Sequence, residues 1–179
     1  YTTILTGTNS TKISKLSKSL GSNSYGIKAD LTKDNEVENL FDQAIKKFKK
    51  IDILVNNAGT VSDAKFENMS EEQWHQVLRI NLDSVFFMCK QVYPYMRSQK
   101  WGRIINIGSM NGQAGQLNQV NYVAAKAGMH GFTKALAQEG AKYGITVNTV
   151  APGYVDTYLM RNMPDRILDK IVDKSPIHR

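Results

Sequence analysis

Short apolar runs alternate with longer helical patterns along this chain, and this alternation restricts the fold more than any other feature. The runs I-D-I-L-V, R-I-I-N-I and T-V-N-T-V-A end at Val55, Ile107 and Ala151. Each run has the length of one strand, and a helical stretch separates it from the next. Short apolar runs separated by helices are typical of parallel strands covered on both faces. The sequence therefore predicts an α/β fold with a doubly wound parallel sheet.

Three stretches carry the signals of helices. Over residues 34–48, apolar residues recur at i, i+3, i+4, i+7, i+8 and i+11, which is the stripe of a helix packed on a sheet. Ser70 and Gln73 form a capping-box pattern ahead of a second helix with one apolar side. A third helix is expected over about 122–142, and Gly144 ends it.

Length and composition indicate a single soluble domain. A chain of 179 residues has the size of one domain, so we expect one domain over 1–179. Hydrophobic residues make up 41% and no apolar run approaches the ~20 residues needed to cross a bilayer, so we expect no membrane contact and a cytoplasmic protein. Cys89, in V-F-F-M-C, has no second cysteine in the sequence and is expected to be a buried, inert thiol.

Charge and histidine content argue against nucleic acid and metal as ligands. The net charge is +7, but the lysines are scattered, and the densest cluster, at 46–50, ends an amphipathic helix. Cations at that end complement the helix dipole, which accounts for the cluster. His75, His130 and His178 lack the spacing of metal ligands. We therefore expect neither a nucleic-acid partner nor a metal.

The turns that follow the three predicted strands carry distinctive residues. N-N-A-G follows the first strand at 56–59, G-S follows the second at 108–109, and P-G-Y follows the third at 152–154. In open doubly wound sheets, ligands bind outside the carboxyl ends of the strands. The three turns are therefore expected to converge on one ligand site.

Tyr122 and Lys126 are spaced i, i+4, so both should project from one face of the third helix. A free phenol is a poor acid at pH 7, but a neighbouring ammonium stabilises the phenolate and lets the pair exchange a proton with a carbonyl or alcohol oxygen. Ser109 follows the second strand and could reach the same crevice. The spacing alone is weak evidence, since Tyr122 could also be an interface tyrosine.

Together these residues resemble the short-chain dehydrogenase/reductase family over essentially the whole chain. The matching positions are N-N-A-G at 56–59, Asn81 in I-N-L, Ser109, Tyr122 with Lys126, and P-G-Y-V-D-T at 152–157. The resemblance implies a Rossmann-like fold and an NAD(P)-dependent oxidoreductase that moves hydride between nicotinamide and a carbonyl carbon. Read alone, Asn81 could be a buried structural amide, and N-N-A-G could be a simple turn.

The resemblance also implies roles for single residues. Tyr122 would supply or remove the proton of the oxygen, and Ser109 would hold that oxygen. Lys126 would bind the nicotinamide ribose and support the phenolate, and Asn81 would hold a water of a proton relay. Cofactor contacts are implied for Asp30 and Leu31 beside the adenine, Asn57, Ala58 and Gly59 on the adenine-ribose side, Thr157 at the nicotinamide amide, and Pro152, Gly153 and Val155.

The opening stretch T-I-L-T-G-T-N-S-T-K resembles a phosphate-binding loop but has no further glycine between Gly7 and Gly21. Within the family it fits the second strand, so the first strand, the glycine loop and the first helix would precede Tyr1. Further elements would follow Arg179, which makes the chain an internal piece of a longer one. Thr8, Asn9 and Ser10 stand where NAD-preferring members carry a carboxylate, so NADP(H) is favoured over NAD(H).

A narrower resemblance concerns the substrate. M-N-G-Q-A-G-Q-L-N-Q-V-N at 110–121, together with P-G-Y, is similar to the acetoacetyl-CoA reductases of the family. It implies an acyl pocket shaped by Asp63, Gln116, Gln119 and Tyr154. NADPH-dependent reduction of acetoacetyl-CoA to 3-hydroxybutyryl-CoA is the leading expectation, and reduction of 3-oxoacyl groups on acyl carrier protein is the alternative.

Two further expectations depend on the resemblance. Family members pair the helix beginning near Ser70 and the helix over 122–142 with their copies, so a homotetramer is expected. A non-catalytic protein that keeps the fold for binding or assembly is the alternative of another class. The presence of all four candidate catalytic residues counts against it.

Overall fold

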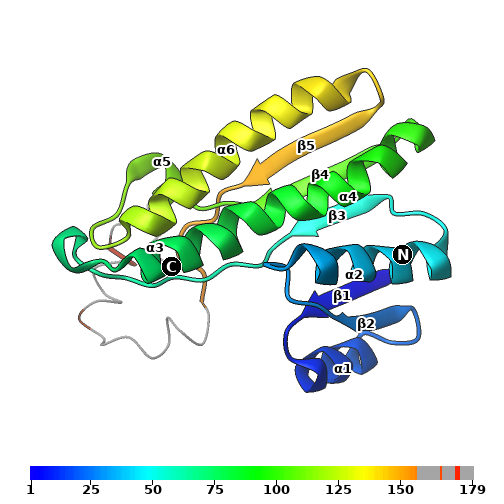
Figure 1. Cartoon of the computed structure of the whole chain (residues 1–179), viewed down its shortest axis with the longest axis horizontal. Coiled ribbons are helices and arrows are strands. Elements are labelled where there is room, and N and C mark those ends of the chain that lie inside the picture. Colours follow the sequence, from blue (N-terminus) through cyan, green and yellow to red (C-terminus); the bar gives the residue numbers. More distant parts are fainter. Residues whose placement is uncertain (157–165, 167–171, 174–179) are drawn as a thin grey trace.

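The computed structural model describes residues 1–156, 166 and 172–173. Five strands and the helices between them alternate along the described chain (Figure 1). The strands are β1 (Thr3–Gly7), β2 (Ser24–Lys28), β3 (Ile53–Asn56), β4 (Gly102–Ile107) and β5 (Ile145–Val150). The α-helices are α1 (Ser10–Ser19), α2 (Asp34–Phe48), α3 (Glu71–Leu78), α4 (Ser84–Gln99), α5 (Asn111–Ala114) and α6 (Val120–Ala141). A 3₁₀ turn, η1 (Phe66–Asn68), precedes α3, and a π-helical segment, η2 (Arg79–Asp83), joins α3 to α4.

All strand pairs are parallel, and they form two sheets. β1 pairs with β2, with Thr3 opposite Ser24, while β4 lies between β3 and β5 in a three-stranded sheet. In that sheet Ile53 is opposite Arg103 and Gly102 is opposite Ile145. Parallel strands need crossover connections, and each crossover here contains a helix. The predicted α/β, Rossmann-like class is confirmed.

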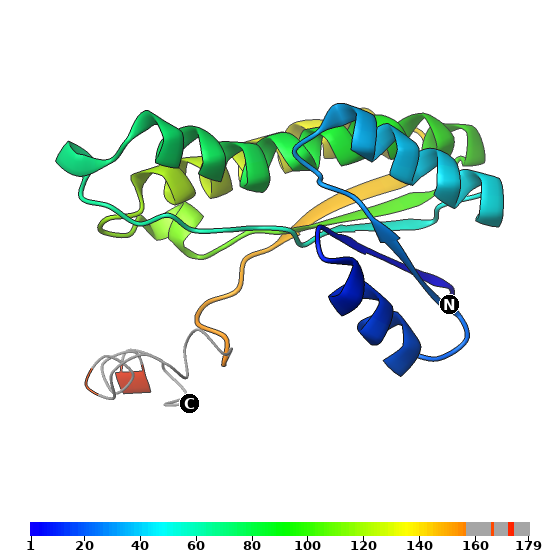
Figure 2. The same ribbon diagram turned by 60° about the horizontal axis from the view of Figure 1, so that its bottom comes forward.

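Helices lie on both sides of the strands. α2, α4 and α6 share one side, and α1 lies on the other side against β1 and β2 (Figure 2). Successive residues of β2 face these two layers: the Tyr25 ring lies 4.9 Å from the Phe48 ring of α2, and Gly26 meets Ile13 of α1. On the three-stranded sheet, the side away from α4 and α6 leaves Ile53, Val55 and Val150 exposed.

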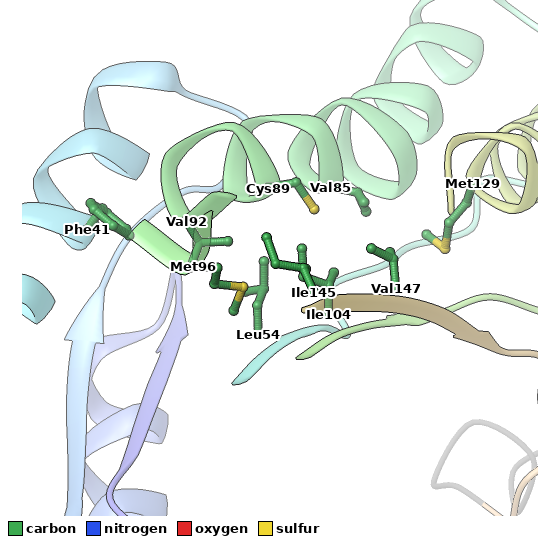
Figure 3. Packing of buried hydrophobic residues seen from close by; sticks show 10 residues of the cluster. All are labelled: Phe41, Leu54, Val85, Cys89, Val92, Met96, Ile104, Met129, Ile145 and Val147. Atoms are coloured by element: carbon green, nitrogen blue, oxygen red, sulfur yellow. The ribbon is translucent and has the colours of Figure 1, made fainter. Parts of the chain in front are cut away.

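The main core lies between the three-stranded sheet and its helices (Figure 3). Side chains of α4 point toward those of the strands, and α2 and α6 close the two sides. The cluster consists of Phe41, Leu54, Val85, Cys89, Val92, Met96, Ile104, Met129, Ile145 and Val147. Burial raises the pKa of the Cys89 thiol to about 12, which fits the inert thiol expected from its apolar neighbours.

The sequence signals for helix ends hold in detail. Ser70 and Gln73 form the reciprocal capping box at the start of α3. The structure adds a cap that was not predicted, since Asn9 accepts a hydrogen bond from the backbone N–H of Lys12 at the start of α1. Gly144 has φ +70°, and a Cβ there would lie 2.5 Å from the carbonyl oxygen of Lys100, so the turn into β5 requires glycine. No helix in the described part of the chain is both long and apolar enough to cross a membrane.

A chain of buried polar side chains crosses the core near the carboxyl ends of the strands. Asn56 on β3 donates to the Oδ1 of Asn106 on β4 at 2.9 Å, and the Nδ2 of Asn106 donates to the Oγ1 of Thr133 on α6 at 2.8 Å. The hydroxyl of Thr149 on β5 donates to the same Oγ1 at 2.8 Å. One hydroxyl on α6 is therefore bonded to two neighbouring strands.

Thr133→Val is expected to lower the free energy of unfolding by about 1–3 kcal/mol. Valine keeps nearly the same shape but leaves the buried Nδ2 of Asn106 without its acceptor, and an unsatisfied buried donor costs about that much. Urea unfolding of the two proteins measures the change. Thr146→Val on β5 is the matched control, because Thr146 is exposed and should change stability by less than about 0.5 kcal/mol. Equal effects at the two positions would contradict the prediction.

Candidate active site

The turns after β4 and β5 meet at one edge of the sheet. The backbone N–H of Gly108 donates to the carbonyl of Val150 at 2.7 Å, and that of Met110 donates to the carbonyl of Pro152 at 3.0 Å. The turn after β3 reaches the same region, since a Cβ at Gly59 would lie 3.7 Å from the Lys126 Nζ, which donates to the carbonyl of Ile107 at the end of β4. The convergence expected from the parallel topology is therefore present.

Lys126 is a buried cation at this edge. Its side chain lies on α6 with 3% of the residue exposed, and Nζ donates to the carbonyl oxygen of Ile107 at 2.7 Å. Tyr122 lies one helical turn earlier, and the Lys126 Nζ is 5.7 Å from the centre of its ring. Burial disfavours the ammonium form and lowers the pKa of Lys126 from 10.5 to about 8. The i, i+4 spacing thus places the phenol and the ammonium on one side of α6.

The stability of the protein should rise above pH 8 because of Lys126. Below about pH 8 this lysine is protonated in both states, so the cost of burying the charge is fully present. Between about 8 and 10.5 the folded state releases the proton while the unfolded state still holds it. The free energy of unfolding then gains up to about 1.4 kcal/mol per pH unit from this group.

Comparison with Lys126→Met isolates this effect. Methionine has a similar length and no charge, and the other titrating groups are shared by both proteins. Urea unfolding between pH 7 and pH 10 should show the wild type gaining stability relative to the variant as pH rises. A difference that stays constant over this interval would contradict the expected titration.

Asn81 is completely buried, and one of its polar atoms has no partner. Its Nδ2 donates to Thr60 at 2.8 Å and to the carbonyl of Val77 at 2.9 Å, which fixes the amide plane. Its Oδ1 has no hydrogen-bond partner among the residues that the structure describes. Asn81 lies in the π-helical segment η2, and such segments often occur at functional sites.

Gly59 lies between Asn81 and Lys126. A Cβ at this position would be 2.8 Å from the Asn81 Oδ1 and 3.7 Å from the Lys126 Nζ. The absence of a side chain at Gly59 therefore leaves space that the unpartnered amide oxygen and the ammonium share. A side chain here would fill the space that a ligand needs to reach these two atoms.

Ser109 is 8% exposed and lies two residues after Ile107, the residue that accepts from Lys126. Its Oγ accepts a hydrogen bond from the backbone N–H of Asn111 at 3.2 Å, so its hydroxyl proton remains available for another acceptor. No hydrogen bond joins Ser109 directly to Tyr122 in the described structure.

The residues expected to bind the adenine end lie on the other sheet. Asp30 and Leu31 follow β2, and the Asp30 carboxylate accepts from the N–H and the hydroxyl of Thr32. These hydrogen bonds hold the pKa of the Asp30 carboxyl below its usual range. Asn57, Ala58 and Gly59 are exposed after β3, and no hydrogen bond between described residues connects them to Asp30 or Leu31.

The third strand end carries the remaining cofactor candidates. Pro152 is tied to Met110, and a Cβ at Gly153 would lie 3.2 Å from the Met110 sulfur. Val155 is exposed. Thr157 lies outside the residues that the structure describes.

Two of the expected substrate residues contact each other. The Nε2 of Gln119 donates to both carboxylate oxygens of Asp63, at 3.1 and 3.0 Å, and its Oε1 accepts from the Nδ2 of Asn111 at 3.1 Å. Gln116 lines a neighbouring groove of about 940 Å³ with Lys65, Phe66, Glu67, Gly115, Leu117, Asn118 and Val120. Tyr154 is 53% exposed, and no hydrogen bond joins it to Gln116 or Gln119 in the described part.

Two asparagines with structural roles at the site were not found from the sequence. Asn111 orients Gln119, and Asn121 is fully buried, donating to the carbonyls of Ser62 and Gln73 at 3.0 and 3.2 Å. The Oδ1 of Asn121 accepts from the N–H of Tyr122 at 2.8 Å. Asn121 is the second residue of α6 and not its N-cap, so no capping pattern marks it in the sequence.

Comparison with known proteins identifies the family of the chain. Residues 1–167 match the family described as short chain dehydrogenase. The acetoacetyl-CoA reductase of Cupriavidus necator is 43% identical over 162 residues, which cover 90% of this chain and 66% of that protein. The acetoacetyl-CoA reductase of Shinella zoogloeoides is 52% identical over 130 residues, covering 72% of this chain and 54% of that protein.

A second kind of relative is similar over more of the chain. The 3-oxoacyl-[acyl-carrier-protein] reductase FabG of Buchnera aphidicola is 42% identical over 178 residues, 99% of this chain and 73% of that protein. The chain spans between about half and two thirds of the length of the acetoacetyl-CoA reductases it matches. With a family match over 167 residues and these identities, the chain belongs to the short chain dehydrogenase family.

Proposed function

We propose that this chain is the central part of an NADPH-dependent reductase of 3-oxoacyl thioesters. The observation that carries the proposal is the grouping of Lys126, Gly59 and the unpartnered Oδ1 of Asn81 beside Tyr122. A buried ammonium next to a phenol is suited to proton transfer at a carbonyl oxygen. The names of the relatives support the substrate class.

The residues present fit a nicotinamide cofactor. The space beside Gly59, which a Cβ would fill, adjoins an ammonium and an amide oxygen that can bond ribose hydroxyls or water. The N-terminus of α1 is suited to bind the 2′-phosphate of NADPH. Thr8, Asn9 and Ser10 carry no negative charge, and Lys12 lies in the first turn of the helix. When bound, NADPH supplies the hydride that reduces the 3-carbonyl carbon.

Side chains of the protein bind the oxygen of the 3-carbonyl group and supply its proton. Ser109 donates a hydrogen bond to the carbonyl oxygen, and Tyr122 gives that oxygen its proton as the alcohol forms. Lys126 stabilises the phenolate that remains. Asn81, through its Oδ1, would hold a water that passes a proton from the solvent to Tyr122 by way of Lys126. The product is a 3-hydroxyacyl thioester.

We propose acetoacetyl-CoA as the preferred substrate. Asp63 and Asn111 fix both ends of the Gln119 amide, so its orientation is set before a substrate binds. A pocket bounded by polar amides favours a short acyl chain, since a long apolar tail would displace water from these groups without offering them hydrogen bonds in return. Gln116 and Tyr154 complete the proposed acyl pocket.

The test compares kcat/KM for acetoacetyl-CoA, a medium-chain 3-oxoacyl-CoA and a 3-oxoacyl-carrier-protein thioester, with the protein made from its complete reading frame. We expect acetoacetyl-CoA to have the highest value. The second candidate function, reduction of carrier-protein thioesters, is favoured by the FabG relative that matches 99% of the chain. A preference of tenfold or more for the carrier-protein substrate, about 1.4 kcal/mol, would establish it. Absence of turnover with all three would favour the non-catalytic alternative.

We also propose that the complete protein is a homotetramer. Phe86 and Tyr95 on α4 are 47% and 40% exposed, and large exposed apolar side chains on a helix are suited to an interface between copies. Light scattering at micromolar concentration should give four times the mass of one chain. A monomer would contradict the proposal.

A further inference from the structure

Gly112 lies where α5 approaches α6 most closely. A Cβ at this position would be 2.9 Å from the carbonyl carbon and from the Cβ of Lys126, and 3.0 Å from the backbone nitrogen of Ala127. These atoms belong to the helix backbone or are fixed directly to it, so they cannot turn aside as the end of a long side chain would. Its φ lies outside the left-handed region, so the requirement for glycine comes from space alone.

Ser109 and Gly112 belong to the same short segment, 109–114. Within it, the N–H of Gly112 donates to the carbonyl of Ser109 at 3.1 Å, and the N–H of Asn111 donates to the Ser109 Oγ at 3.2 Å. Asn111 also anchors the segment to α6 through Gln119. Because these bonds tie Ser109 to its neighbours, a displacement at Gly112 would move the hydroxyl as well.

On α6, Gly112 contacts Lys126, a member of the proposed proton-transfer pair. Gly112 touches α6 at Lys126, one turn from Tyr122, and the Lys126 side chain continues to the carbonyl of Ile107. We infer that Gly112 is a positioning residue, because its missing side chain sets the distance between the Ser109 hydroxyl and the Tyr122–Lys126 pair. This inference rests on the proposed reductase function. Gly112 contacts neither substrate nor cofactor in this role.

An alanine at 112 has to displace the segment to reach an ordinary contact distance of at least 3.4 Å. The movement needed is on the order of half an ångström, which reaches the tolerance of about 0.5 Å for a catalytic group. A misplacement of about 1 Å can lower a rate ~10²-fold. Gly112→Ala is therefore expected to lower kcat by about 10- to 100-fold and to change NADPH affinity less than about twofold.

The experiment uses the complete protein with Gly112→Ala, and Gly131→Ala as the matched control. Gly131 is on α6, the helix that Gly112 contacts, and a Cβ there would meet nothing within 4 Å, so its alanine variant should retain full turnover. Steady-state kinetics, NADPH binding by fluorescence and urea unfolding are measured for both. A folded Gly112→Ala variant with kcat within twofold of wild type would overturn the inference, and so would a fall in kcat matched by an equal loss of NADPH affinity.

Combination with Ser109→Ala separates positioning from a general structural effect. If Gly112 acts through Ser109, its alanine substitution should lower kcat much less in the Ser109→Ala background than in wild type. Equal effects in the two backgrounds would show that Gly112 does not act through Ser109. If Gly112→Ala does not fold, Asn111→Ala releases the same segment without adding atoms, and an unchanged kcat in that variant would count against the inference.

Crystal structures of wild type and Gly112→Ala test the positioning role without measuring activity. In the Gly112→Ala protein, the Ser109 Oγ should lie about 0.5 Å or more farther from the Tyr122 hydroxyl than in wild type. An unchanged distance overturns the positioning inference even if the enzyme is active. If wild type reduces no 3-oxoacyl thioester, the proposed function fails, and this distance alone decides whether Gly112 positions Ser109.

Discussion

Tyr122→Phe is expected to lower kcat by at least 10²- to 10⁴-fold in the complete protein. The substitution removes the hydroxyl that donates the proton, and positioned general acids contribute about that factor. The ring itself remains, so its packing 5.7 Å from the Lys126 ammonium is preserved. NADPH affinity and the unfolding midpoint should stay near the wild-type values.

Tyr154→Phe is the matched control for the loss of a phenol. Tyr154 is 53% exposed and is proposed to contact the acyl group and not to transfer the proton. Its substitution should raise KM for the thioester more than it lowers kcat. A Tyr122→Phe enzyme with half the wild-type turnover would remove Tyr122 from the proton-transfer role.

Lys126→Met is expected to weaken NADPH binding and turnover together. One ammonium is proposed to bind the ribose and to stabilise the phenolate, and a hydrogen bond from a charged group contributes about 1.5–3 kcal/mol. That range corresponds to a loss of NADPH affinity of roughly 10- to 150-fold. The buried bond from Nζ to Ile107 is lost as well, so the comparison with wild type must be made on folded protein.

Fluorescence titration with NADPH measures the first effect, and single-turnover kinetics at saturating NADPH measures the second. Lys134→Met, an exposed lysine two turns along the same helix, is the control for removal of a positive charge from α6. It should leave both quantities near wild type. Normal NADPH affinity in the Lys126→Met protein would show that the ammonium does not hold the ribose.

Local patterns in the sequence predicted the regular elements because their causes are local. The apolar stripe from 34 to 48 matches α2, which ends where Lys49 adopts a left-handed conformation with φ 66°. The capping box at Ser70 depends only on the residue three positions later. β2 was missed: its five residues, S-Y-G-I-K, include a glycine and too few apolar residues to show a strand period. Gly26 is required by contact with Ile13 of α1, which no spacing reveals.

The sequence indicated that Tyr122 and Lys126 lie near each other, but not the contacts that hold the surrounding segments in place. Parallel topology alone places the three turns at one edge of the sheet, and the bonds from Gly108 to Val150 and from Met110 to Pro152 follow from it. Asn121 is different, because its partners Ser62 and Gln73 are distant in sequence. Contacts of this kind depend on how loops pack after the strands are in place, and a single sequence carries no signal for them.

The π-helical segment η2 shifts the phase of one long helix. At its end the N–H of Ser84 bonds to the carbonyl of Arg79, five residues back, so the turn holds one residue more than an α-helical turn. An α-helix advances about 100° per residue, so without this residue α3 and α4 would be rotated against each other by about that angle. With this extra residue, Val77 in α3 and Asn81 within η2 are buried, and Val85, Cys89 and Val92 in α4 are buried against the sheet. Deletion of one residue from η2 would keep every apolar residue of α3 and α4. Asn81 and the apolar face of α4 could then no longer be buried at the same time.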